Sequence, residues 1–241
     1  MKLNRLQIAL LLILFTALCS VSCSPRTNED YQLDAQMSKT PESRAELLRK
    51  VQIFAASDDE EAAAAWQALQ NQSRQKLLHE LSGMAQTLSG DDKNRVFVAF
   101  TLCRLNYDYP ANRAIVLSAL SQNRLYKDLG GDWAADLVGR LMMQGDGELL
   151  SPLFSASSWS DGAMATNLIS YYSRALAADP EHFLQLLASQ PTAIRKDVMV
   201  LLEDHTLTAE ERQKVDIHLS RLSRQSKLRE TAIQIMNALA K

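Results

Sequence analysis

The sequence contains few of the residues that cradle small ligands or cross-link a chain. It has eight glycines and three cysteines among 241 residues. With so few glycines, loops that wrap a phosphate are scarce, and no P-loop, dinucleotide fingerprint or G-x-S-x-G elbow occurs. These absences exclude the common nucleotide-binding and serine-hydrolase signatures. An enzyme is therefore the less favoured interpretation, and we predict no cofactor.

Charge of neither sign dominates. Lys and Arg number 26 against 28 Asp and Glu, which gives a net charge of −2. Nucleic acids bind proteins mainly through clusters of Lys and Arg that neutralise phosphates. Because the sequence has no basic excess, we predict no nucleic-acid partner.

The N-terminal residues have the pattern of an export signal. Lys2 and Arg5 form a basic start, residues 8–18 are uncharged and mostly apolar, and small residues follow up to Ser22. The apolar run of about 11 residues is shorter than the roughly 20 that a spanning helix needs. We therefore predict that residues 1–22 are a signal peptide. An uncleaved anchor is a weaker alternative because the run is short.

Cys23 directly follows the predicted cleavage point. The stretch S-V-S-C that ends at Cys23 resembles the lipobox of bacterial lipoproteins, with Ser20 in place of the usual aliphatic residue. The resemblance implies that the Cys23 thiol carries lipid and anchors the protein to a membrane of the cell envelope. It implies the outer membrane, facing the periplasm, if there are two membranes, because Ser24 is not Asp. Ordinary cleavage near Ser22 would instead give a soluble periplasmic or secreted protein.

Residues 23–40 are polar and lack apolar periodicity. Such a composition does not bury enough surface to fold, so we predict a flexible linker. A coil of about 17 residues spans roughly 20–25 Å on average, which would hold a folded body just off a membrane. The body then contains Cys103 alone, and no internal disulfide is available. Cys103 lies in an apolar helical stripe, which predicts a buried, inert thiol.

From residue 41 to residue 241, apolar side chains recur with helical spacing. This predicts a single all-α body of about 11 to 12 helices. Residues 91–107 are apolar nearly all round, as expected of the most buried helix, with Tyr107 in its stripe. Thr208 and Glu211 have the spacing of a capping box. Residues 155–160 are small and polar, which predicts a loop.

The predicted helices group into pairs of unequal length. Successive pairs begin near residues 41, 74, 110, 147, 180 and 209, a spacing typical of helical repeats. We therefore predict irregular stacked helix pairs, an α-solenoid-like array, with a compact irregular bundle as the alternative. Tyr172, Ala175 and Pro180 resemble the end of a tetratricopeptide repeat. The unequal spacing resembles a looser, HEAT-like array better.

No histidine lies in a metal-binding or catalytic pattern. His79 and Glu80 begin like H-E-x-x-H, but Gly83 stands where the second zinc ligand would be. The apolar neighbours of His218 predict a core or boundary position, and His182 is predicted to be solvated in a first helical turn. We predict no metal site and no catalytic residue.

One turn has the composition of a protein-binding surface. It contains two aromatic rings beside an amide and a carboxylate, which are frequent in interfaces; the residues are Asn106, Tyr107, Asp108 and Tyr109. A rigid corner between two helices is an equally good interpretation.

A second stretch gives the acidic body a basic end. Its cations are Arg221, Arg224, Lys227 and Arg229. Such a cluster suits anionic lipid headgroups or wall polymer, although an exposed, salt-bridged face is the favoured alternative.

These patterns predict a membrane-tethered, exported helical scaffold that binds a protein or peptide partner in the bacterial envelope without catalysis. We expect the partner on a concave face with exposed aromatic residues. Two alternatives remain open. One is an envelope hydrolase acting on cell-wall or glycan material, which would need two carboxylates or a paired histidine in a cleft. The other is a purely structural envelope lipoprotein.

Overall fold

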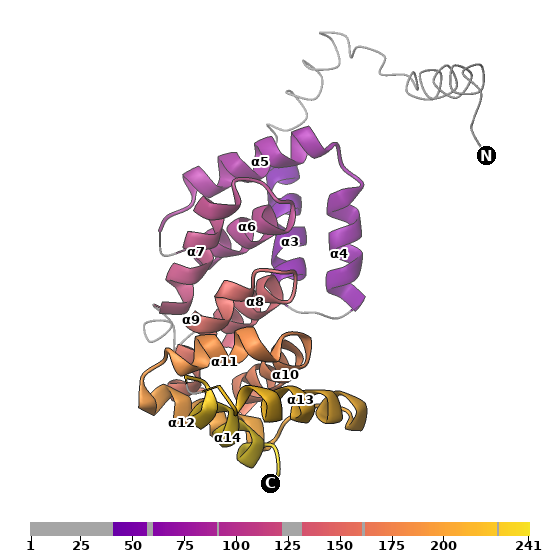
Figure 1. Ribbon diagram of the computed structural model, residues 1–241. Coiled ribbons are helices and arrows are strands. Elements are labelled where there is room, and N and C mark those ends of the chain that lie inside the picture. Colours follow the sequence, from indigo (N-terminus) through magenta and orange to yellow (C-terminus); the bar gives the residue numbers. More distant parts are fainter. Residues whose placement is uncertain (1–40, 57–59, 91, 122–131, 161, 226) are drawn as a thin grey trace, which may run out of the picture. The chain divides into compact units, whose positions relative to one another are not determined.

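The computed structural model describes residues 41–56, 60–90, 92–121, 132–160, 162–225 and 227–241 (Figure 1). These residues form twelve α-helices and two short 3-10 helices, with no strand among them. The all-α prediction is confirmed. The predicted signal peptide, Cys23 and the linker lie outside the described residues. The chain divides into two units, Met1–Ala45 and Glu46–Lys241, and the core, the groove and the surfaces described below lie within the second.

The described helices follow one another along the chain in this order. The first six are α3 (Pro41–Ala56), α4 (Glu60–Gln70), α5 (Arg74–Thr87), α6 (Lys93–Arg104), α7 (Tyr109–Ser121) and α8 (Asp132–Met142). The 3-10 helix η3 (Gly147–Leu149), α9 (Leu150–Ala156) and the 3-10 helix η4 (Ser157–Trp159) come next. The last five are α10 (Gly162–Ala178), α11 (Pro180–Ala188), α12 (Thr192–Glu203), α13 (Ala209–Leu222) and α14 (Arg229–Ala238).

Side chains placed just before helices determine several boundaries. Asp179 accepts a hydrogen bond from the backbone N–H of His182, and Pro180 occupies the first helical position of α11. Thr208 and Glu211 form both hydrogen bonds of a capping box at the start of α13, which confirms that prediction. The starts of α11 and α13 therefore have a local cause in the sequence.

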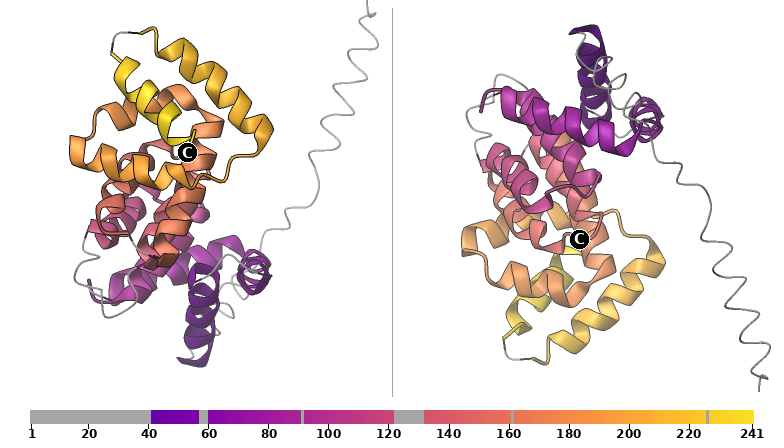
Figure 2. Two further views of the ribbon diagram at one scale, coloured as in Figure 1. Left: turned by 90° about the horizontal axis from the view of Figure 1, so that it is seen from below. Right: turned by 90° about the horizontal axis from the view of Figure 1, so that it is seen from above.

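The helices form irregular stacked pairs, as predicted. Pairs begin at Pro41, Arg74, Tyr109, Gly147, Pro180 and Ala209. In the first half, α6 packs against α5 and α7, and α8 against α7. In the second half the packing is less regular, because α12 contacts α9, α10 and α14, while α11 contacts α9, α10, α13 and α14. Figure 2 gives two further views of these helices.

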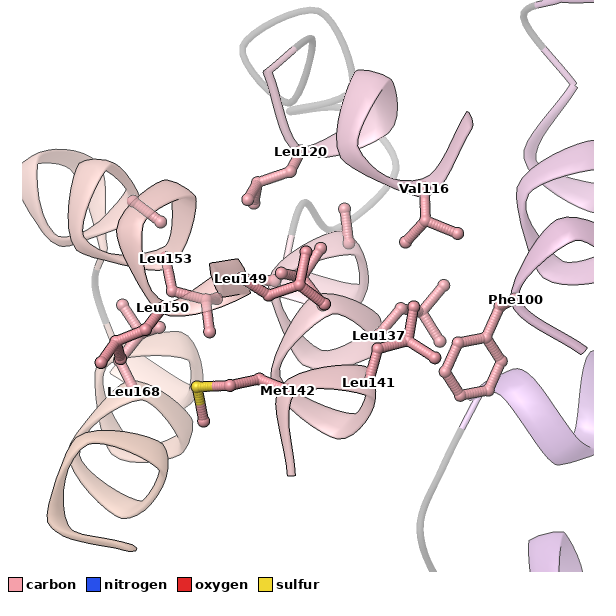
Figure 3. Close-up of a cluster of buried hydrophobic side chains, with 14 of the residues drawn as sticks. Phe100, Val116, Leu120, Leu137, Leu141, Met142, Leu149, Leu150, Leu153 and Leu168 are labelled. Atoms are coloured by element: carbon pink, nitrogen blue, oxygen red, sulfur yellow. The ribbon is translucent and has the colours of Figure 1, made fainter. Parts of the chain in front are cut away.

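One continuous hydrophobic core runs through the unit. Figure 3 shows side chains of α6, α7, α8, α9 and α10 gathered in it, among them Phe100, Val116, Leu137, Leu153 and Leu168. Residues 96–103 of α6 are all buried, in line with the predicted enclosed helix.

Two local predictions were wrong. Tyr107 lies beyond the end of α6 and is 41% exposed, because Asn106 adopts a φ of 51° that no helix can continue. Residues 155–160 are not a loop, since α9 runs to Ala156 and η4 follows. Ser157 is buried there, and the hydrogen bond between its hydroxyl and the Tyr172 hydroxyl at 2.7 Å offsets the cost of burying a polar group. Composition alone does not show such a partner.

A buried arginine joins three helices. Arg140 on α8 is 5% exposed, and its two terminal nitrogens donate to the carbonyl oxygens of Phe54 and Ala55 at 3.0 and 3.2 Å. Carbonyls in the last turn of a helix have no partner within it, so Arg140 satisfies the end of α3. Its guanidinium also lies 4.8 Å from the ring centroid of Phe100 on α6 and 3.7 Å from the Asp136 carboxylate.

A glycine allows α8 and α10 to approach closely. A Cβ at Gly139 would overlap the aromatic ring of Tyr171. The Tyr171 hydroxyl donates to Asp136 Oδ1 at 2.6 Å. Asp136 therefore connects α10 to the carboxylate–guanidinium pair that it forms with Arg140.

We predict that Arg140→Met lowers the free energy of unfolding by about 3 kcal/mol, because it leaves two buried carbonyls without donors and a carboxylate without its cation. Urea unfolding measures the loss. Arg49→Met is the control, because Arg49 is 62% exposed and should change stability by less than about 0.5 kcal/mol. Equal stability of the two variants would refute the structural role of Arg140.

Gly139→Ala should destabilise the protein by about 1–3 kcal/mol, because the added methyl group forces the Tyr171 ring out of place. Gly83→Ala on α5 is the matched control. A Cβ at Gly83 meets nothing within 4 Å, so this change should stabilise the helix by about 0.5–1 kcal/mol. Thermal unfolding followed by circular dichroism should shift in opposite directions for the two variants.

Candidate binding groove

A groove of ≈ 590 Å³ opens between the loop that follows α8 and the junction of α10 with α11. Its volume lies within the range of about 300–1,000 Å³ that is usual for ligand sites. The apolar part of its lining consists of Met142, Met143, Leu150, Ala175, Ala178 and Phe183. The polar and charged part consists of Asp146, Glu148, Arg174, Asp179 and His182. We call these residues, with Gly145 and Gly147, the binding groove.

The floor of the binding groove belongs to the hydrophobic core. Met142, Leu150 and Phe183 are buried, and Figure 3 shows Met142 extending from α8 toward Leu150 and Leu168. Met143, one position further, is 41% exposed at the rim. The floor is rigid because packed core side chains form it, whereas the rim carries an unbranched, adaptable side chain.

The loop wall is fixed by one carboxylate. Gly145 ends the turn after α8 with a φ of 116°, a conformation that favours glycine. Asp146 follows, and its Oδ2 accepts hydrogen bonds from Arg113 Nε at 2.6 Å and from the Tyr109 hydroxyl at 2.7 Å. Both donors come from α7, so Asp146 ties the loop to that helix. Asp146 therefore has a structural role, because it holds the loop in place.

The opposite wall is the start of α11. Asp179 accepts from the backbone N–H of His182 at 3.0 Å and so caps the helix. The imidazole of His182 lies over the loop wall, where a Cβ on Gly147 would come within 3.2 Å of Nε2. Glu148 Oε1 is 4.0 Å from the same nitrogen. Gly147 therefore makes room for a histidine that spans the two walls, and protonation of His182 would pair it with Glu148.

The charged and polar groups of the binding groove are arranged to bind a ligand. Asp146 and Asp179 already accept hydrogen bonds that hold the walls in place. Arg174 and Glu148 are exposed at the rim and His182 is half-buried. They present one cation, one anion and one imidazole above an apolar floor. Among the described residues, no group of His, Cys, Asp and Glu is arranged to hold a metal ion.

The predicted protein-binding turn forms the corner between α6 and α7, and its Tyr109 contacts the loop wall of the binding groove. Asn106 and Asp108 have positive φ angles of 51° and 41°, and Asn112 donates to the carbonyl oxygens of Tyr107 and Asp108. Asn106, Tyr107 and Asp108 are exposed, whereas Tyr109 is half-buried and its hydroxyl binds Asp146. Tyr109 thus differs from the other three residues in both its exposure and its contacts.

The four basic residues of the second predicted surface, Arg221, Arg224, Lys227 and Arg229, are all exposed at the end of α13 and the start of α14. Arg221 lies 3.8 Å from Glu181. Cys23, the predicted lipidation site, lies outside the described residues.

The sequence did not predict the roles of His182 and Asp146. The partners of Asp146, which are Tyr109 and Arg113, lie more than 30 residues earlier in the chain, so helical spacing does not reveal them. His218 was also misplaced. It is exposed, because it lies on the outer side of α13 although the adjacent Leu219 is buried.

Among the described residues, the free thiol is that of Cys103, whose sulfur lies 4.0 Å from the carbonyl oxygen of Tyr109 at the corner between α6 and α7. Cys103 is 4% exposed, which confirms the predicted burial. Burial raises the pKa of the Cys103 thiol to about 12, the Asp146 carboxylate adds to the increase, and the Arg113 guanidinium opposes it. The pKa of Tyr109 is likewise raised, first by burial and then by its hydrogen bond to Asp146. Both groups remain neutral at physiological pH.

Comparison of this chain with protein-family models, with curated protein sequences and with solved structures finds no match. None of the described helices is long and apolar enough to span a membrane.

The Cys103 thiol should make stability depend on alkaline pH. The pKa of this thiol in the folded protein lies above its ordinary value of about 8.5. As pH rises past about 8.5, the thiol therefore ionises in the unfolded chain at a lower pH than in the folded protein, and the free energy of unfolding falls. We expect a fall of up to about 1.4 kcal/mol per pH unit between pH 9 and pH 10, below the ordinary tyrosine pKa. Urea unfolding at both pH values should show a smaller fall for Cys103→Ala. An unchanged pH dependence in that variant would contradict the assignment.

Proposed function

We propose that this protein is a membrane-tethered, exported helical scaffold that binds a segment of a protein partner in the binding groove, without catalysis. The observation that carries the proposal is the groove itself, which combines a rigid apolar floor with a charged rim. Apolar side chains of a partner would be buried against the accessible apolar lining, Met143, Ala175 and Ala178, which lies over the packed floor. Rim groups would then fix the orientation of the bound segment.

The rim supports a protein ligand. Met143 is an exposed methionine beside Arg174 and Glu148, and methionines adapt their shape to different apolar partners. A polypeptide has both the apolar side chains for the floor and the backbone amides for the rim. The tether rests on the N-terminal sequence pattern, which is independent of the groove.

A hydrolase acting on wall or glycan material is the second candidate, because His182 and Glu148 lie 4.0 Å apart within the groove. The hydrogen bonds of Asp146 and Asp179 weigh against it. Catalysis by a general base requires a group free to take a proton from the substrate, and these two carboxylates are engaged in holding the walls. Glu148 and His182 are the groups of the groove that stay available to a substrate. Binding needs no group to take a proton, so it remains the first proposal.

Site-specific photocrosslinking in intact cells tests the binding groove. We expect a photoreactive residue at Met143 to give a discrete adduct with one protein, identified by mass spectrometry. Tyr107 is the matched control position, because it is also 41% exposed but does not line the groove. Ala178→Arg should lower the Met143 adduct at least about fivefold, since it places a large side chain in the groove.

Ala193→Arg introduces the same side chain at an exposed position on α12 and should leave the adduct unchanged. Equal adducts in the two arginine variants would overturn the groove as the binding site. The same adduct from Tyr107 and not from Met143 would assign binding to the corner.

The same cells test the tether. The unchanged protein should fractionate with membranes and carry lipid on Cys23 by mass spectrometry, and Cys23→Ser should release it. Unmodified protein that is already soluble would refute the tether and leave the groove result intact.

A further inference from the structure

The exposed side of the last two helices carries apolar side chains among cations. Ile217 on α13 is 63% exposed and Ile233 on α14 is 39% exposed. Ile217, Arg221 and Arg224 lie four and three residues apart, so they share one stripe of α13. All three line a shallow depression of ≈ 700 Å³ on that helix. An isoleucine with so much exposed surface loses stabilising burial unless something covers it.

The stripes of the two helices adjoin. The Ser220 hydroxyl on α13 lies 3.9 Å from the Met236 sulfur on α14. Ile233 lies one turn before Met236, and Arg229 one turn before Ile233, so these residues continue the surface along α14. Figures 1 and 2 show α13 and α14, in yellow, side by side. We call Ile217, Arg221, Arg224, Lys227, Arg229 and Ile233 the basic face.

The charge of the basic face is of one sign. Residues 217–229 contain four Lys and Arg and no Asp or Glu. Three acidic residues border it, and each has a partner: Asp216 pairs with Arg212, Glu230 accepts from Gln234, and Glu181 lies 3.8 Å from Arg221. Among the described residues, no carboxylate lies within 4 Å of Arg224, Lys227 or Arg229. Cations therefore outnumber unpaired carboxylates around the exposed isoleucines.

We propose that the basic face docks on an anionic lipid surface. Cations reach the headgroup phosphates while the isoleucines enter the boundary between headgroups and acyl chains, which is how amphipathic helices lie on membranes. Charge complementarity selects a lipid surface over a protein here, because the face combines several unpaired cations with aliphatic side chains and contains no aromatic residue.

Docking through the basic face would bring the binding groove close to the membrane. The contact between Arg221 and Glu181 joins α13 to the first turn of α11, and His182 in the groove follows Glu181 directly. A partner bound in the groove would then lie beside the membrane surface. Lipid docking itself requires neither the groove ligand nor the lipid on Cys23.

Vesicle binding of the full chain carrying Cys23→Ser tests the proposal, because this background has no covalent lipid. We expect stronger cosedimentation with vesicles of phosphatidylglycerol and phosphatidylcholine than with phosphatidylcholine alone, and weaker cosedimentation at high salt. In that background, Arg221→Gln with Arg224→Gln should lower the partition coefficient on anionic vesicles roughly 25-fold, since each cation contributes about fivefold. Ile217→Ser should lower it about tenfold.

Arg49→Gln with Lys50→Gln is the matched control, because it removes the same charge from α3 and should change partitioning less than about twofold. Circular dichroism confirms that each variant is folded. Equal binding to neutral and anionic vesicles would overturn the proposal, as would an equal loss in the two double variants. Neither result would affect crosslinking from Met143, so failure here is distinguishable from failure of the binding groove.

Discussion

A guanidinium held between aromatic rings links the helices on which the binding groove is built. The last turn of α3 is buried, so its carbonyl oxygens need donors that water cannot supply. Arg140 provides them from a residue 85 positions later in the chain, with its charge against the rings of Phe54 and Phe100. Asp136 balances that charge and also accepts from Tyr171. One polar network thereby links α3, α6, α8 and α10.

The binding groove depends on this network because α8 and α10 supply its two sides. Close packing at Gly139 sets how near the helices come. The loop after α8 is then drawn onto α7 by Asp146, and the start of α11 is fixed by Asp179. Hydrogen bonds within the protein therefore hold the walls in place before a ligand binds. Because the walls are already ordered, less conformational entropy of the protein is lost on binding.

The proposed function combines three separate parts of the chain. The N-terminal pattern would confine the protein to a membrane, the basic face would set the orientation of its helical body, and the binding groove would receive the partner. Each part is physically separate. Confinement and orientation raise the effective concentration of the groove near a partner in the same membrane without strengthening any single contact.

The sequence by itself determined the helices, because periodicity and capping act over a few residues. The starts of the pairs, the capping box of Thr208 and the enclosed α6 all followed from local spacing. Tertiary structure alone decided that Asp146 meets Arg113, that Ser157 is buried against Tyr172, and that His182 lines a groove. Each of these contacts joins residues that are distant in the chain. The packing of the helices brings such residues together, and helical spacing within one segment carries no information about which of them will meet.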